Sequence, residues 1–65
     1  MKILKLVNSS PDRQGDPLLI NADHIICVYE DHENGGSLST RILGSGGIVW
    51  WVEESLFEVK KLLEN

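Results

Sequence analysis

The chain has 65 residues, one cysteine and a formal net charge of −4, and these values already exclude several classes of protein. Residues 1–65 suffice for a single domain, and a chain of this size buries only about 60% of the surface that its unfolded form exposes. The lone Cys27 cannot form a disulfide within the chain. Six Lys and Arg residues give no extended basic surface, so we expect no general binding to nucleic acid.

The apolar residues are distributed as in a globular domain. Hydrophobic residues make up 42% of the chain, and apolar runs such as 18–20 and 48–52 are far shorter than the roughly 20 residues of a membrane span. Residues 1–20 lack the long apolar core of a secretory signal. We therefore expect a cytoplasmic protein, in a bacterial cell or an infected host cell, with no membrane partner.

Up to residue 52, the chain is typical of a small antiparallel β protein. Runs rich in Val, Ile, Leu and aromatic residues alternate with turn-forming residues. The predicted strands are residues 2–7, 17–21, 25–30, 37–43 and 48–52. The predicted connections are a loop over 8–17, a bend over 21–25, a hairpin turn around Asn34 and Gly35, and a glycine turn over 44–47.

The hydrophobic period then changes to that of a helix. Four apolar residues of the stretch 54–65 recur at helical spacing, namely Leu56, Val59, Leu62 and Leu63. Ser55, with Glu58 three residues later, matches the pattern of a capping box. A helix of only about ten residues is not stable alone, so it must pack its apolar stripe on the sheet.

Together these elements predict a β-rich α+β fold, in which a small antiparallel meander of four to five strands is closed by one C-terminal amphipathic helix. The chain has neither a disulfide nor the four Cys and His ligands of a structural zinc site. Because a small domain without such reinforcement is marginally stable, we expect this protein to form a homo-oligomer.

Two short motifs carry a resemblance to a known family. The segments "LLINADHIICVYED" and "IVWWVEESLFEVKKLL", separated by a glycine turn, resemble the small FlbD-like proteins of bacteria. The most specific matches are "INADHI", with Asn21, Ala22 and Asp23, and "VEES" over 52–55. The resemblance implies a small cytoplasmic β protein without catalytic residues, linked to flagella or to phage and mobile-element genomes. A longer first loop and the tryptophan pair depart from the family pattern.

Trp50 and Trp51 are adjacent in a predicted strand. Neighbouring strand residues point to opposite faces of a sheet, so the two indoles cannot share one core. The single helix covers only one face, although several strands carry apolar residues on both. An uncovered apolar face marks an interface or a ligand groove. One tryptophan should therefore lie in the core and the other against a second subunit, a partner or a ligand; alternation does not decide which.

Arg41 is the candidate charged partner of a tryptophan. If the strands at 37–43 and 48–52 pair across a four-residue loop, Arg41 lies opposite Trp50 and Leu43 opposite Ile48. A guanidinium stacked on an indole is worth about 0.5–2 kcal/mol. Two interpretations remain open: the pair clamps a planar anionic ligand, or Arg41 only covers the ring from solvent.

The glycine turn adds Ser45, Gly46 and Gly47 to the candidate binding residues. Free backbone amides in a turn can cradle an anion, so this turn with Arg41 and a tryptophan fits a nucleotide-like ligand. A strict phosphate-binding loop also requires a Lys and a following helix, and this sequence has neither at that place. A plain hairpin turn is the alternative.

Acidic and imidazole side chains gather around Asp23, His24 and residues 30–33. Their number and spacing fit no standard metal site, so we predict no metal and no cofactor and keep metal binding as a minor alternative. Cys27 lies within an apolar strand and is expected to be a buried, inert thiol. No residue is predicted to be catalytic.

These features favour a non-enzymatic, homo-oligomeric binding protein. The residues predicted to contact a ligand or partner are Trp50, Trp51, Arg41, Ser45, Gly46 and Gly47. In a phage or mobile-element setting the protein would bind and neutralise a host factor, either a nucleotide-like signalling molecule or a defence protein. The alternative implied by the resemblance is a flagellar regulatory or adaptor protein.

Overall fold

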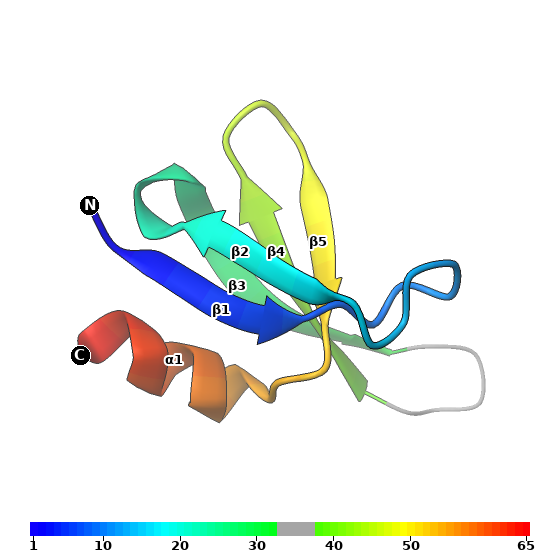
Figure 1. Ribbon diagram of the computed structural model, residues 1–65. Coiled ribbons are helices and arrows are strands. Elements are labelled where there is room, and N and C mark those ends of the chain that lie inside the picture. The colour runs from blue at the N-terminus through cyan, green and yellow to red at the C-terminus, as the bar shows by residue number, and fades with distance from the viewer. Residues whose placement is uncertain (33–37) are drawn as a thin grey trace.

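The computed structural model describes residues 1–32 and 38–65, and that part of the chain forms a small β-rich α+β fold (Figure 1). Its strands are β1 (Ile3–Val7), β2 (Pro17–Asn21), β3 (Ile25–His32), β4 (Leu38–Gly44) and β5 (Val49–Val52). A 3₁₀-helix, η1 (Ala22–His24), separates β2 from β3, and the helix α1 (Leu56–Glu64) follows β5. The predicted five strands and C-terminal helix are thereby confirmed.

The strands form two antiparallel sheets. β1 pairs with β2, while β3, β4 and β5 form a three-stranded sheet in that order. The two sheets meet where β1 ends: Asn8 forms an isolated bridge with Val52, and the Glu53 amide donates to the carbonyl of Val7, 2.9 Å away. The chain is therefore a meander that breaks at η1 and reconnects between β1 and β5.

The core lies between the two sheets and the helix. In Figure 1, β1 and β2 pass in front of the three-stranded sheet, and α1 lies alongside β1. The fully buried hydrophobic residues are Leu4 and Leu6 of β1, Ile20 of β2, Ile42 of β4, Val52 of β5 and Val59 of α1. Each element except β3 and η1 thus contributes at least one buried side chain, and only one face of the three-stranded sheet faces this core.

The capping box predicted for the helix is confirmed. The Ser55 hydroxyl accepts from the Glu58 amide at 3.1 Å, and the Glu58 carboxylate accepts from the Ser55 amide at 3.2 Å. Val59 is buried and Leu62 half-buried, but Leu63 is 36% exposed and lies at the edge of the apolar stripe. No helix in the described part of the chain is long and apolar enough to span a membrane.

Local turn chemistry explains the connections. The predicted bend after β2 is η1, which is capped by the Asn21 side chain accepting from the Asp23 amide. Gly46 and Gly47 both have a φ of +84°, a backbone region that favours glycine. The hairpin turn predicted at Asn34 and Gly35 lies outside the described residues.

Candidate functional site

The structure separates the two tryptophans as alternation requires and decides which one joins the core. Trp50 pairs with Ile42 of β4, on the face that carries the buried Val52, and its half-buried ring packs against the core. The ring lies so close over Gly44 that a Cβ atom added there would overlap with it. Trp50 is therefore the core tryptophan.

Trp51 lies on the other face and stacks with Arg41. The guanidinium carbon of Arg41 is 4.0 Å from the centre of a Trp51 ring. The prediction that Arg41 lies opposite Trp50 was wrong by one residue. In the structure, Arg41 pairs with Trp51 and Leu43 pairs with Val49. The cause is the turn: the Gly44 amide donates to the carbonyl of Ile48, so Gly44 is a strand residue and the loop starts one residue later than expected.

We call the face with Trp51 the outer face; among residues 1–32 and 38–65, no helix and no other sheet covers it. Its members, placed by strand pairing and alternation, are Cys27, Tyr29 and Asp31 of β3, Ser39, Arg41 and Leu43 of β4, and Val49 and Trp51 of β5. Tyr29 is 37% and Val49 41% exposed. Cys27 is also exposed, so the expected burial of its thiol was wrong: none of the residues of β3, on either face, is fully buried.

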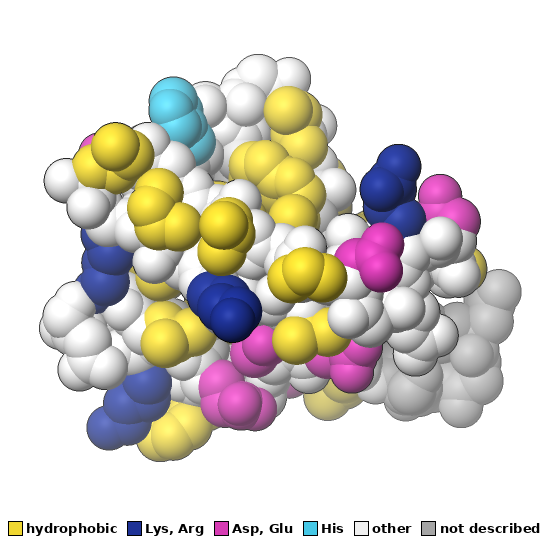
Figure 2. Space-filling model, viewed as in Figure 1, with side chains coloured by type: hydrophobic (Ala, Val, Ile, Leu, Met, Phe, Trp, Pro, Cys, Tyr) yellow, Lys and Arg dark blue, Asp and Glu magenta, His cyan; other side chains and the backbone are white. Residues whose placement is uncertain are grey.

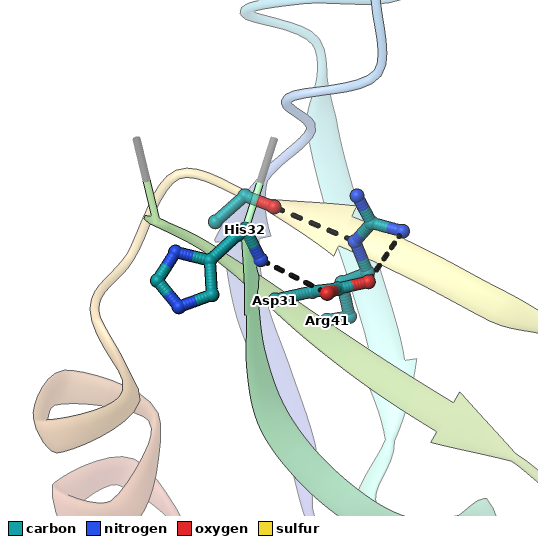
Figure 3. A network of polar contacts seen from close by, with 4 residues as sticks. Asp31, His32 and Arg41 are labelled. Carbon is teal, nitrogen blue, oxygen red and sulfur yellow. Dashed lines mark hydrogen bonds and ion pairs between the residues drawn. The ribbon is translucent and has the colours of Figure 1, made fainter. Parts of the chain in front are cut away.

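The charge of Arg41 is already matched within the outer face (Figure 3). Its Nη1 atom is 3.3 Å from Oδ2 of Asp31, and its Nε–H donates to Oγ of Ser39 at 3.4 Å. The other Asp31 carboxylate oxygen accepts from the backbone amide of His32 at 2.9 Å. An anionic ligand would have to displace Asp31, so the geometry favours the interpretation in which Arg41 covers the Trp51 ring.

The glycine turn does not join this cluster. Ser45 is four residues from Arg41 along the chain, a separation of roughly 13 Å in an extended strand. The amides of Ser45 and Gly47 donate to the carbonyls of His24 and Gly44 at 2.8 and 3.2 Å. These amides are therefore not the free donors that an anion cradle was expected to offer, and the turn instead fastens the β4–β5 hairpin to η1.

The acidic and imidazole residues also lie apart. Nδ1 of His24 is 3.1 Å from Oγ of Ser45, at the end of the sheet opposite to His32. Within residues 1–32 and 38–65, no three His, Cys, Asp or Glu side chains come close enough together to hold a metal ion. Glu33 lies outside the described residues.

A groove between β3 and α1 is a feature that sequence reasoning missed. Its volume is about 540 Å³, and it is lined by Ala22, Ile25, Ile26, Cys27, Val28, Leu56, Lys60, Leu63 and Glu64. The signal that could have found it is the run of consecutive apolar residues at 25–28, which is longer than one buried face of a strand requires.

Fold and surface together define a class: a small β-rich α+β protein with an aromatic sheet face left open to solvent. Comparison of the chain with protein-family models, with curated proteins and with solved structures finds no match. The resemblance to FlbD-like proteins therefore stays a prediction from the two motifs.

Proposed function

We propose that this chain is a non-enzymatic, homo-oligomeric binding protein that recognises another protein through its outer face. One observation carries the proposal: Tyr29 and Val49 are 37% and 41% exposed, beside the half-buried Trp51, on a sheet face whose opposite side forms the core. Tyrosine, tryptophan and arginine are enriched at the centres of protein interfaces. An accessible face built from these residues therefore fits a protein partner.

Charge distinguishes a protein partner from a small anion. Arg41 is paired with Asp31, so the cation and the carboxylate of this cluster balance one another. A nucleotide-like ligand needs unpaired donors for its phosphates, and the amides of Ser45 and Gly47 donate elsewhere. A broad apolar surface with a balanced ion pair suits a protein surface better, and in a phage or mobile-element setting that protein would be a host factor.

The exposed hydrophobic surface supports oligomerisation. Six hydrophobic residues of the described chain are fully buried, whereas ten large hydrophobic residues are exposed. On the side shown in Figure 2, hydrophobic side chains over β1, β2 and α1 are interrupted by charged ones and form no continuous patch. Self-association that covers exposed hydrophobic residues would add the stability that so small a core lacks.

Native mass spectrometry of the protein purified gently from the cells that make it would test the proposal. Trp51→Ser removes the largest aromatic group of the outer face, and Phe57→Ser is the control because Phe57 is exposed on α1, away from that face. We expect a protein partner to accompany the wild type and Phe57→Ser but not Trp51→Ser.

Two results would contradict recognition of a protein. One is an added mass of a few hundred daltons that survives Trp51→Ser, which would favour a nucleotide-like ligand at another site. The other is that the wild type, Trp51→Ser and Phe57→Ser all give the same complexes in the mass spectrum. The flagellar adaptor role implied by the resemblance has a separate test, which is the presence of flagellar genes beside the gene for this chain.

A further inference from the structure

The groove between β3 and α1 follows the free edge of a strand. Four consecutive residues of β3, 25–28, line it together with residues of η1 and α1. Cys27 and Val28 pair regularly with β4 and point to opposite faces of the sheet, so one groove can touch both only by running along the edge of the strand. The groove therefore borders the backbone of β3 as well as its side chains.

β3 is an outer strand of its sheet, so no described strand pairs with the backbone groups along one of its edges. In the described part of the chain its only strand partner is β4, and at eight residues it is the longest strand. Outer strands present unpaired N–H and C=O groups, which readily pair with another chain. Ile26 stands at an irregularity in the β3–β4 pairing and is 64% exposed beside this edge. The backbone edge of β3 and the exposed side chain of Ile26 together form a surface on which a further strand can pair.

We propose that the groove is filled by a second copy of this chain, with β3 of the two copies paired antiparallel around a two-fold axis. The inference rests on the proposed function, because it specifies how the binding protein oligomerises. A two-fold axis perpendicular to the sheet reverses the direction of both β3 and α1 in the second copy. The same surface patch of both copies then forms the interface, as in most dimers.

Charge complementarity favours a second copy over an unrelated peptide. Lys60 and Glu64 both line the groove, four residues apart on α1, and both are exposed. Antiparallel α1 helices bring Lys60 of one copy towards Glu64 of the partner subunit, and the reverse. Ile26 and Leu63, which are 64% and 36% exposed, would be covered by the same contact. Opposite charges and apolar residues are thus both matched by self-association.

The arrangement also enlarges the recognition surface. A face of three strands, which here have eight, seven and four residues, has a footprint of roughly 300 Å², whereas a standard protein interface buries about 800 Å² on each partner. Pairing β3 with β3 makes one six-stranded sheet, and the outer faces of both copies lie on the same side. The dimer therefore presents about twice the surface that contains Trp51.

Sedimentation equilibrium of the full chain tests the dimer. Ile26→Lys places a charge in the groove, and Leu19→Lys is the matched control because Leu19 is equally exposed, at 66%, on β2. We expect the wild type and Leu19→Lys to dimerise, and Ile26→Lys to raise the dimer dissociation constant by about tenfold or more. Circular dichroism would verify that each variant is folded.

A charge exchange tests the two-fold register. Lys60→Glu and Glu64→Lys should each weaken the dimer, and the double exchange should restore it, because each new pair again joins opposite charges. A monomeric wild type, an Ile26→Lys variant that dimerises like Leu19→Lys, or a double exchange without rescue would each overturn the proposal. Trp51→Ser should leave the dimer intact, so loss of partner binding and loss of the dimer are separate results.

Discussion

The same strands form both faces of the three-stranded sheet, but only one of these faces is buried in the core. On the inner face, Ile42 and Val52 are 0% and 1% exposed beneath β1, β2 and α1. On the outer face, Tyr29 and Val49 are 37% and 41% exposed. Both faces are apolar in sequence, so hydrophobicity alone does not make a core. A face becomes the core only where another element lies close enough to cover it.

The adjacent tryptophans show the same contrast within one peptide unit. Trp50 packs against the core and over Gly44, where no side chain fits beneath it. Trp51 is covered only in part, by the guanidinium of Arg41, whose charge is balanced by Asp31. The indole is therefore a structural group at one position and a candidate recognition group at the next.

The largest expected effect compares Ile42→Ala with Leu43→Ala, neighbours on β4 that point to opposite faces. Ile42→Ala leaves a cavity in the core and should lower the free energy of unfolding by about 3 kcal/mol. Leu43→Ala on the outer face should lower it by less than about 1 kcal/mol. Urea unfolding measures both values. Equal losses would mean that the outer face is as important for stability as the core.

Gly44→Ala should have the next largest effect. The new Cβ would overlap with the ring of Trp50 and lower the free energy of unfolding by about 1–3 kcal/mol. The double variant Gly44→Ala/Trp50→Leu should lose less than the sum of the two single variants, because the smaller side chain leaves room for the methyl group. Thermal unfolding of the wild type, the two single variants and the double variant gives the coupling free energy between positions 44 and 50. Strictly additive losses of stability would contradict the close contact between Gly44 and Trp50.

Ser55→Ala tests the element that covers part of the inner face. Loss of the cap should lower the free energy of unfolding by about 1 kcal/mol, because the Glu58 amide loses its acceptor. Ser45→Ala is the control: the exposed Ser45 hydroxyl contacts only the exposed ring of His24 and caps no helix, so its loss should cost under about 0.5 kcal/mol. Chemical unfolding monitored by circular dichroism compares the two, and an equal cost would argue against the capping box.

The smallest expected effect on stability is that of Asp31→Asn. The pair with Arg41 is partly exposed, so its loss should change the free energy of unfolding by less than about 0.5 kcal/mol. The freed guanidinium should nevertheless give the outer face an affinity for inorganic pyrophosphate that the wild type and the loop control Asp12→Asn lack. Isothermal titration would detect it, and binding by the wild type would show that Arg41 is already available to anions.

Local sequence patterns predicted the secondary structure well. Alternation located the strands, the change of period located α1, and Ser55 with Glu58 predicted its cap. These features depend on residues within a few positions of each other, where propensity and side-chain capping act directly. The prediction that the two tryptophans face opposite sides has the same local origin, since it follows from strand geometry alone.

Features that depend on turn register and on packing between elements were predicted less well. Gly44 reads as a turn residue, but its amide pairs with Ile48, and this shifts the partner of Arg41 from Trp50 to Trp51. Cys27 reads as a core residue, yet it lies on the outer face. The register depends on one hydrogen bond across the hairpin turn, and the exposure of Cys27 depends on which face of the sheet is covered.

The amino-acid sequence was enough to determine a β-rich chain with two apolar sheet faces, one amphipathic helix and two indoles on opposite sides. Only the tertiary structure decided which face is covered, that Arg41 is paired with Asp31, and that a groove follows the free edge of β3. The physical reason is that neither face of a strand is buried until another element packs against it. Its two faces differ only after β1, β2 and α1 pack against one of them, and that packing depends on contacts between residues far apart in the chain.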